Sequence, residues 1–138
     1  DGFGLAFDGS QTALSGETEA QPVMSLSITH PYSGDLRVLV GVADRAGNIV
    51  CEVVVAVPDD TDSNPGLSAE VSMGDCASFY PPSPDSKWLM FAADEAFDDE
   101  GTIDRFALLG PDGQSFEYLD LPRVIPDDDI NGVLLELP

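Results

Sequence analysis

The chain has 138 residues, of which 43% are hydrophobic, which is enough for one domain with a core and too little for two ordinary domains. Its 26 acidic residues stand against 5 basic ones and give a formal charge of −21, which argues against nucleic acid and anionic membranes as partners. Cations are the natural counterpart, although a solvated acidic surface suited to salty surroundings explains the same composition. No segment approaches the ~20 apolar residues of a membrane helix, since the richest run, 49–57, is short and contains Glu52.

Alternating apolar and polar residues, the pattern typical of strands, dominate the first half of the chain. Met24, Leu26 and Ile28 alternate with polar or smaller residues, which predicts a strand over 23–29 with these three side chains facing inward. The Val-rich segments 36–43 and 49–57 flank a stretch whose Gly and Asn favour a tight hairpin.

The second half of the chain adds strands separated by Gly and Pro. Residues 87–93 and 104–109 predict two strands, and a Pro-Asp-Gly turn leads into a third over 115–119. The Pro-rich stretch 80–84 is expected to be a connection, because proline lacks the N–H that a sheet ladder requires.

Many short strands with Gly and Pro between them favour an all-β fold, an antiparallel jelly-roll-like β-sandwich. Trp88 and Phe106 are then expected in its core. We divide the chain into an N-terminal segment, 1–22, a sandwich, 23–120, and a C-terminal segment, 121–138.

Two motifs in this order resemble the P domain, or homo B domain, which follows the catalytic domain of kexin-like and many bacterial subtilisin-like proteases. The first is His-Pro-Tyr-Ser-Gly-Asp-Leu, within Ile28–Val38. The second begins with the Trp-Leu strand Lys87–Asp94 and continues through an acidic Gly-Thr turn into a Phe-Ala-Leu strand that ends at Leu108. The resemblance covers about 23–110. It implies a jelly-roll sandwich that helps a neighbouring catalytic domain to fold and remain stable, and this chain contains no such catalytic domain.

The opening pattern of a P domain, Ile-Pro-Asp followed by Gly-Val and an alternating strand, is here at the opposite end, in 124–137. The strand order therefore looks permuted. Either the last strand, with Val133, Leu135 and Leu137 on one face, folds back into its own sandwich, or it pairs with the next copy of the chain. An equally good donor strand is the N-terminal segment, whose apolar residues alternate in the same way: Phe3, Leu5 and Phe7.

Three acidic loops offer the oxygen ligands that Ca²⁺ prefers. None is an EF-hand, because the downstream bidentate Glu is missing. We favour the loop around Asp94, because the resemblance implies calcium near the equivalent turn. The candidate ligands are Asp60, Asp62 and Asn64 in the first loop, Asp94, Asp98, Asp99 and Glu100 in the second, and Asp127, Asp129 and Asn131 in the third.

Cys51 and Cys76 are the only cysteines, and their spacing is not that of a metal site. In an acidic protein that is secreted or held at the cell surface they are expected to form one disulfide. The alternative is two buried thiols in a cytosolic protein. The chain begins at Asp1 without a basic and apolar leader, which fits a mature secreted product as well as an excised segment.

Catalytic motifs are scarce, so we expect that this protein is not an enzyme. His30 is the only histidine, and we expect it to brace the Pro-Tyr turn, with Asp35 ordering the same loop. The chain lacks Cys-x-x-Cys, Gly-x-Ser-x-Gly and phosphate-binding Gly motifs. Paired carboxylates hydrolyse glycosides in some enzymes, but such pairs are uninformative in so acidic a chain.

Two hypotheses follow. In the first, the protein is a secreted, non-catalytic, structural or adhesive surface subunit that assembles into filaments by exchange of a terminal strand and is stabilised by Ca²⁺. In the second, it is the accessory P domain of a secreted subtilisin-like serine protease. The expected partner is a second copy in one case and a neighbouring domain in the other.

Overall fold

A computed structural model describes residues 13–14, 16–17, 21–59, 65–95, 100–127 and 129–138. Several of the residues singled out above lie outside these ranges, namely Phe3, Leu5, Phe7, Asp60, Asp62, Asn64, Asp98 and Asp99.

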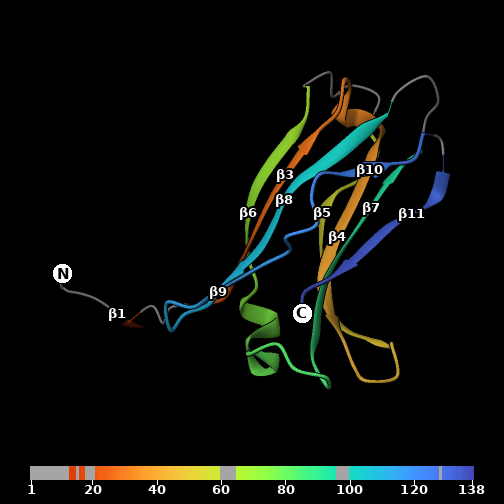
Figure 1. Cartoon of the computed structure of the whole chain (residues 1–138). Helices are drawn as coiled ribbons and strands as arrows, with labels where there is room; N and C mark the ends of the chain where they lie inside the picture. The colour runs from red at the N-terminus through yellow and green to blue at the C-terminus, as the bar shows by residue number, and fades with distance from the viewer. Residues whose placement is uncertain (1–12, 15, 18–20, 60–64, 96–99, 128) are drawn as a thin grey trace.

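The described residues form two antiparallel sheets that pack face to face, which confirms the predicted β-sandwich (Figure 1). One sheet has the order β10–β8–β3–β6, with β9 also pairing with β8, and the other has the order β11–β7–β4–β5. The strands of the first are β3 (Val23–Thr29), β6 (Leu67–Ser72), β8 (Gly101–Leu109), β9 (Ser115–Glu117) and β10 (Arg123–Ile125). Those of the second are β4 (Leu36–Ala43), β5 (Ile49–Ala56), β7 (Lys87–Asp94) and β11 (Asp129–Glu136). Outside the sandwich, β1 (Ala13–Leu14) pairs with β2 (Gly16–Glu17), and two 3₁₀ helices are η2 (Ser33–Asp35) and η3 (Gly74–Phe79).

The strand order is that of a jelly roll whose first two strands stand at the end of the sequence. Counted from β10 to β11 and then from β3 to β8, the first strand pairs with the eighth and the second with the seventh. In the same count, the third pairs with the sixth and the fourth with the fifth. This nested pairing is the jelly-roll arrangement. The C-terminal segment therefore contributes one strand to each sheet.

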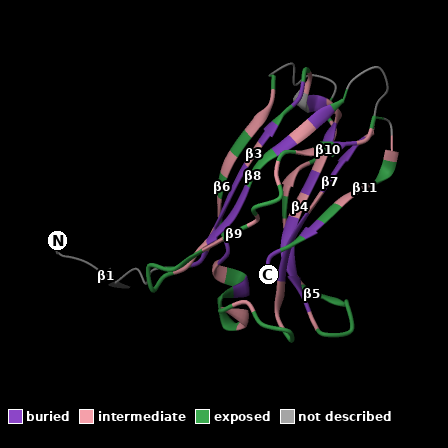
Figure 2. Ribbon diagram, viewed as in Figure 1, coloured by how far each residue is buried: buried purple, intermediate pink, exposed green. Residues whose placement is uncertain are grey.

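The core lies between the sheets and follows the two-residue period of the strands (Figure 2). Met24, Leu26 and Ile28 face inward from β3, as predicted. Trp88 and Phe106, which come from opposite sheets, are both buried in the core, which confirms their predicted role.

Most of the predicted strands are present, with small shifts at their ends. The hairpin between β4 and β5 is confirmed, and its turn is closed by a 2.8 Å hydrogen bond from the Asp44 amide to the Asn48 carbonyl. β8 begins at Gly101 rather than at 104, and β9 ends at Glu117 rather than at 119. β6 and β10 were not predicted. β6 is short and consists mostly of small residues, and β10 has only three residues.

The last strand folds back into its own sandwich. β11 pairs antiparallel with β7, placing Val133 opposite Ala92 and Leu135 opposite Met90. Leu135 is 1% exposed and Leu137 is 6% exposed, so the apolar face of this strand is used within the chain. Filament formation by exchange would require β11 of another copy to make the same contacts, and it stays a prediction.

A disulfide joins Cys51 on β5 to Cys76 in η3, as predicted. The bridge spans 25 residues, and on a chain-entropy estimate such a loop stabilises the fold by about 3 kcal/mol. Disulfides of this kind are typical of oxidising compartments. No helix within the described part of the chain has the length and apolar character needed to cross a membrane.

Neighbouring residues of β11 test whether the last strand belongs to the monomer core. Leu135→Ala should lower the free energy of unfolding by about 2–4 kcal/mol, because it leaves a cavity between the sheets. Leu134→Ala, on the opposite face of the same strand and 55% exposed, should change it by less than about 0.5 kcal/mol. Urea denaturation in dilute solution measures both. Equal losses from the two substitutions would contradict the burial of this face of β11 in its own sandwich.

Candidate functional site

A buried histidine and a buried aspartate join the two sheets at one end of the sandwich. His30 follows β3 directly, and Asp94 is the last residue of β7. The imidazole Nε2 lies 2.9 Å from Asp94 Oδ2, and both side chains are fully buried. His30 Nδ1 accepts a 2.9 Å hydrogen bond from the Tyr32 amide, so Nε2 carries the proton that is donated to Asp94. His30 thus braces the Pro-Tyr turn, as predicted.

Gly101 makes room for the imidazole at the start of β8. A Cβ atom at this position would lie 2.7 Å from His30 Cδ2 and 2.7 Å from the Thr29 carbonyl oxygen. Both distances are shorter than ordinary van der Waals contact, and the second atom belongs to the backbone, so it cannot swing away. The Gly of the acidic Gly-Thr turn is therefore required by the ring of His30.

Asp35 completes this end of the structure. Its carbonyl accepts a 2.9 Å hydrogen bond from the Glu95 amide, which ties the turn after β3 to the residue that follows β7. The Arg37 guanidinium donates to the Glu95 carboxylate, an interaction that raises the pKa of the arginine. The two motifs found in the sequence therefore form one structural unit.

The carboxylate of Asp35 lies close enough to His30 and Asp94 for the three to hold a metal ion, since their ligand atoms are within 4.8 Å of one another. Both ring nitrogens of His30 already take part in hydrogen bonds. A metal on the imidazole would have to displace Tyr32 or Asp94. If the imidazole keeps its present hydrogen bonds, this grouping offers carboxylate oxygens from Asp35 and Asp94.

The chain on either side of all three predicted calcium loops lies at this same end of the sandwich. The Asp59 amide, before the first loop, donates a 2.9 Å hydrogen bond to the Gly34 carbonyl. Asp94, before the second loop, is the register partner of Asp129 in the third. Of the predicted ligands, Asp94 is buried and Asp129 half-buried, whereas three are exposed: Glu100, Asp127 and Asn131. The sequence offered no sign that the flanks of these loops lie at one end, because their position follows from the strand order.

A second feature is an apolar outer face on the sheet β11–β7–β4–β5. Leu39 pairs with Val54 on β5 and with Phe91 on β7, and Phe91 pairs with Leu134 on β11. These residues alternate with inward-facing ones, so all four side chains point away from the core. We call them the apolar row.

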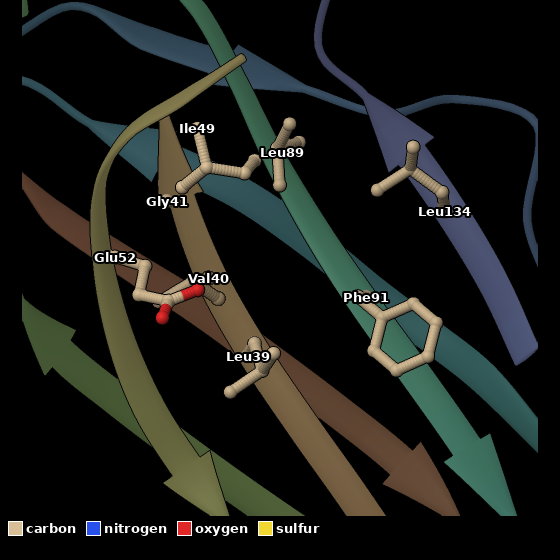
Figure 3. A pocket seen from close by; sticks show the side chains of 8 residues that line it. All are labelled: Leu39, Val40, Gly41, Ile49, Glu52, Leu89, Phe91 and Leu134. Carbon is tan, nitrogen blue, oxygen red and sulfur yellow. The ribbon is translucent and has the colours of Figure 1, made fainter. Parts of the chain in front are cut away.

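The next row along the strands, two residues away, is smaller and mixed. Gly41 pairs with Glu52 and with Leu89, and Leu89 pairs with Glu136. We call these four the mixed row. Together the two rows line most of a hollow of ≈ 320 Å³ that lies over Gly41 (Figure 3). Only glycine fits at position 41, because a Cβ atom there would collide with the Cys51 carbonyl oxygen of β5.

The outer face of the other sheet is polar. Ser25 lies between Glu70 and Arg105, donating to the carboxylate at 2.7 Å and accepting from the guanidinium at 2.9 Å. Ser27 pairs with Ser68 beside them. The two sheets of one molecule therefore present chemically different outer faces, which alternation on single strands does not reveal until the sheets are assembled. The sequences of β4 and β7 nevertheless indicated an apolar outer face, because both strands carry apolar residues at odd and even positions.

Comparisons with protein-family models, with curated proteins and with solved structures found no match to this chain.

The buried pair is tested by comparing two acidic residues at the same end of the sandwich. Asp94→Ala should lower the free energy of unfolding by about 2–4 kcal/mol, because the buried His30 N–H loses its acceptor. Glu100→Ala, at an exposed position, should change it by less than about 0.5 kcal/mol. Thermal and urea unfolding of both variants provide the measurement, and a stable Asp94→Ala protein would overturn the proposed brace.

Proposed function

We propose that this protein is a non-catalytic, secreted or surface-exposed structural subunit that docks onto a protein partner through the apolar face of the sheet β11–β7–β4–β5. The observation that carries the proposal is the contrast between this face and the polar outer face of the other sheet, in a chain of formal charge −21.

Large apolar side chains on this face remain in contact with water in the single chain. Val54 and Leu134 are each 55% exposed, and Ile49, which also lines the hollow, is 51% exposed. Contiguous apolar surface of this kind marks protein interaction sites, because covering it returns roughly 25 cal/mol for each Å² removed from water. A partner that covers the hollow would gain most from Leu134 and Ile49, the exposed apolar side chains that line it.

A structural role agrees with how the reactive side chains are used. The single histidine holds a turn through both ring nitrogens. Both cysteines are committed to the disulfide. The disulfide also supports the assignment to an oxidising compartment, hence to the secreted or surface-exposed class.

A second candidate is the accessory domain of a secreted protease, as the resemblance to the P domain implies. One observation favours it: the two motifs on which the resemblance rests are joined by the bond between His30 and Asp94. In this case the apolar face would cover part of the neighbouring catalytic domain.

We further propose that Ca²⁺ stabilises the acidic end of the sandwich. Asp35, Asp94 and Asp129 lie together there, and their repulsion opposes folding. A cation that binds only the folded chain raises its stability by mass action.

Calcium titration of the melting temperature tests this proposal. At a calcium concentration a hundred times the dissociation constant, the gain is about 2.7 kcal/mol, which corresponds to a rise of roughly 5–15 °C for a chain of this size. Asp35→Asn should reduce the rise. NaCl at matched ionic strength is the control, and an equal rise with NaCl would show screening without binding.

Docking through the apolar face is tested by site-directed crosslinking. Leu134→Cys, labelled with a benzophenone maleimide and returned to cells of the encoding organism, should form a photoadduct at one defined surface of one protein. The native cysteines do not react, because both are in the disulfide. Ser68→Cys, on the polar outer face, is the matched control and should form none. Equal yields from the two positions would sink the docking proposal.

A further inference from the structure

We infer that the partner of the apolar face is a second copy of this chain, packed face to face with its strands running in the reverse direction. This inference rests on the proposed function, since it names the partner of the same surface. Three observations carry it: the order of the two rows, the distribution of acidic residues and the size of the face.

The two rows are complementary to each other in size and charge. The apolar row presents Leu39 at its centre, where the mixed row presents Gly41 and its hollow. A two-fold axis that lies in the interface, between the rows and perpendicular to the strands, places the apolar row of each copy over the mixed row of the other. Leu39 then fills the hollow over the partner copy's glycine. A contact of this kind is isologous and closes at a dimer.

With the same axis, each glutamate of the mixed row lies away from the equivalent glutamate of the other copy. Glu52 faces the apolar side chain of Val54 across the interface, and Glu136 faces Leu134. An axis through the mixed row itself would set each glutamate opposite its equivalent. Size and charge therefore select the same position of the axis.

Reversal of the strands also separates the two acidic ends. Asp94, Asp129 and the flanks of the predicted calcium loops all lie at one end of each sandwich. In the reversed arrangement these ends lie at opposite ends of the dimer, about 25 Å apart for strands of eight residues, which exceeds the screening length of ~8 Å at physiological salt. In a parallel arrangement they would lie side by side.

The face is large enough for a reversible dimer. Four strands at the usual spacing make a face of about 20 by 25 Å, or about 500 Å² per copy and ~1,000 Å² for the pair, which is the lower limit for specific interfaces. Since each copy carries a formal charge of −21, association should strengthen as salt screens the repulsion between copies.

Sedimentation equilibrium of three variants at position 134 and a control tests the inference. The wild-type chain should form a monomer–dimer equilibrium that tightens as NaCl is raised. Leu134→Glu, which sets two glutamates together at each of two symmetric contacts, should weaken dimerisation by at least about tenfold. Leu134→Lys should retain the dimer, because the lysine meets Glu136 of the other copy. Adding Glu136→Lys to the Leu134→Lys variant should abolish the dimer, because two lysines then face each other at each contact.

Leu119→Lys makes the same charge change at a residue that is 87% exposed and outside the face, and it should leave the equilibrium close to that of the wild-type chain. Unfolding curves of all variants separate lost association from lost folding. A wild-type chain that stays monomeric at every salt concentration, or equal weakening by Leu134→Glu and Leu134→Lys, would overturn the reversed dimer. If the benzophenone at position 134 then still marks one surface of another protein, docking survives and only the second copy is excluded.

Discussion

The hydrogen bond between His30 and Asp94 is the constraint on which one whole end of this sandwich depends. It joins the last residue of a strand in one sheet to the residue after a strand in the other, and it does so in the interior. The imidazole requires a glycine at the start of β8, and the turn beside it is held through the amide of Tyr32. At the opposite end, the disulfide between β5 and η3 performs a comparable task with a covalent bond.

The outer faces of the two sheets differ in chemical character. One outer face is a polar network in which Ser25 joins a carboxylate to a guanidinium, and it needs nothing beyond water. The other exposes a row of large apolar side chains around a hollow created by Gly41. The formal charge of −21 opposes association of copies at low salt, so such a face remains compatible with a dissolved chain until salt screens the charge and a partner covers the face.

Local patterns in the sequence predicted much of the fold. Alternation located β3, and apolar runs located β4, β5 and β7. The sequence around His30 predicted that this residue braces the turn. It did not identify Asp94 as the hydrogen-bond acceptor, because Asp94 lies 64 residues away. The common position of the residues that flank the three acidic loops and the contrast between the outer faces depend on which strands become neighbours. Those relationships are properties of the assembled sheets, and single-strand patterns do not contain them.

The permuted strand order also sets when the fold can be completed during synthesis. β10 and β11 are the last strands in this sequence, yet they pair with β8 and β7 and bring Ile125, Leu135 and Leu137 into the core. Until they have left the ribosome, β8 and β7 lack these neighbours and the core is incomplete on that side. A nascent chain that has not reached this segment therefore lacks one strand of each sheet, so both sheets are completed only after residues 123–136 have been synthesised.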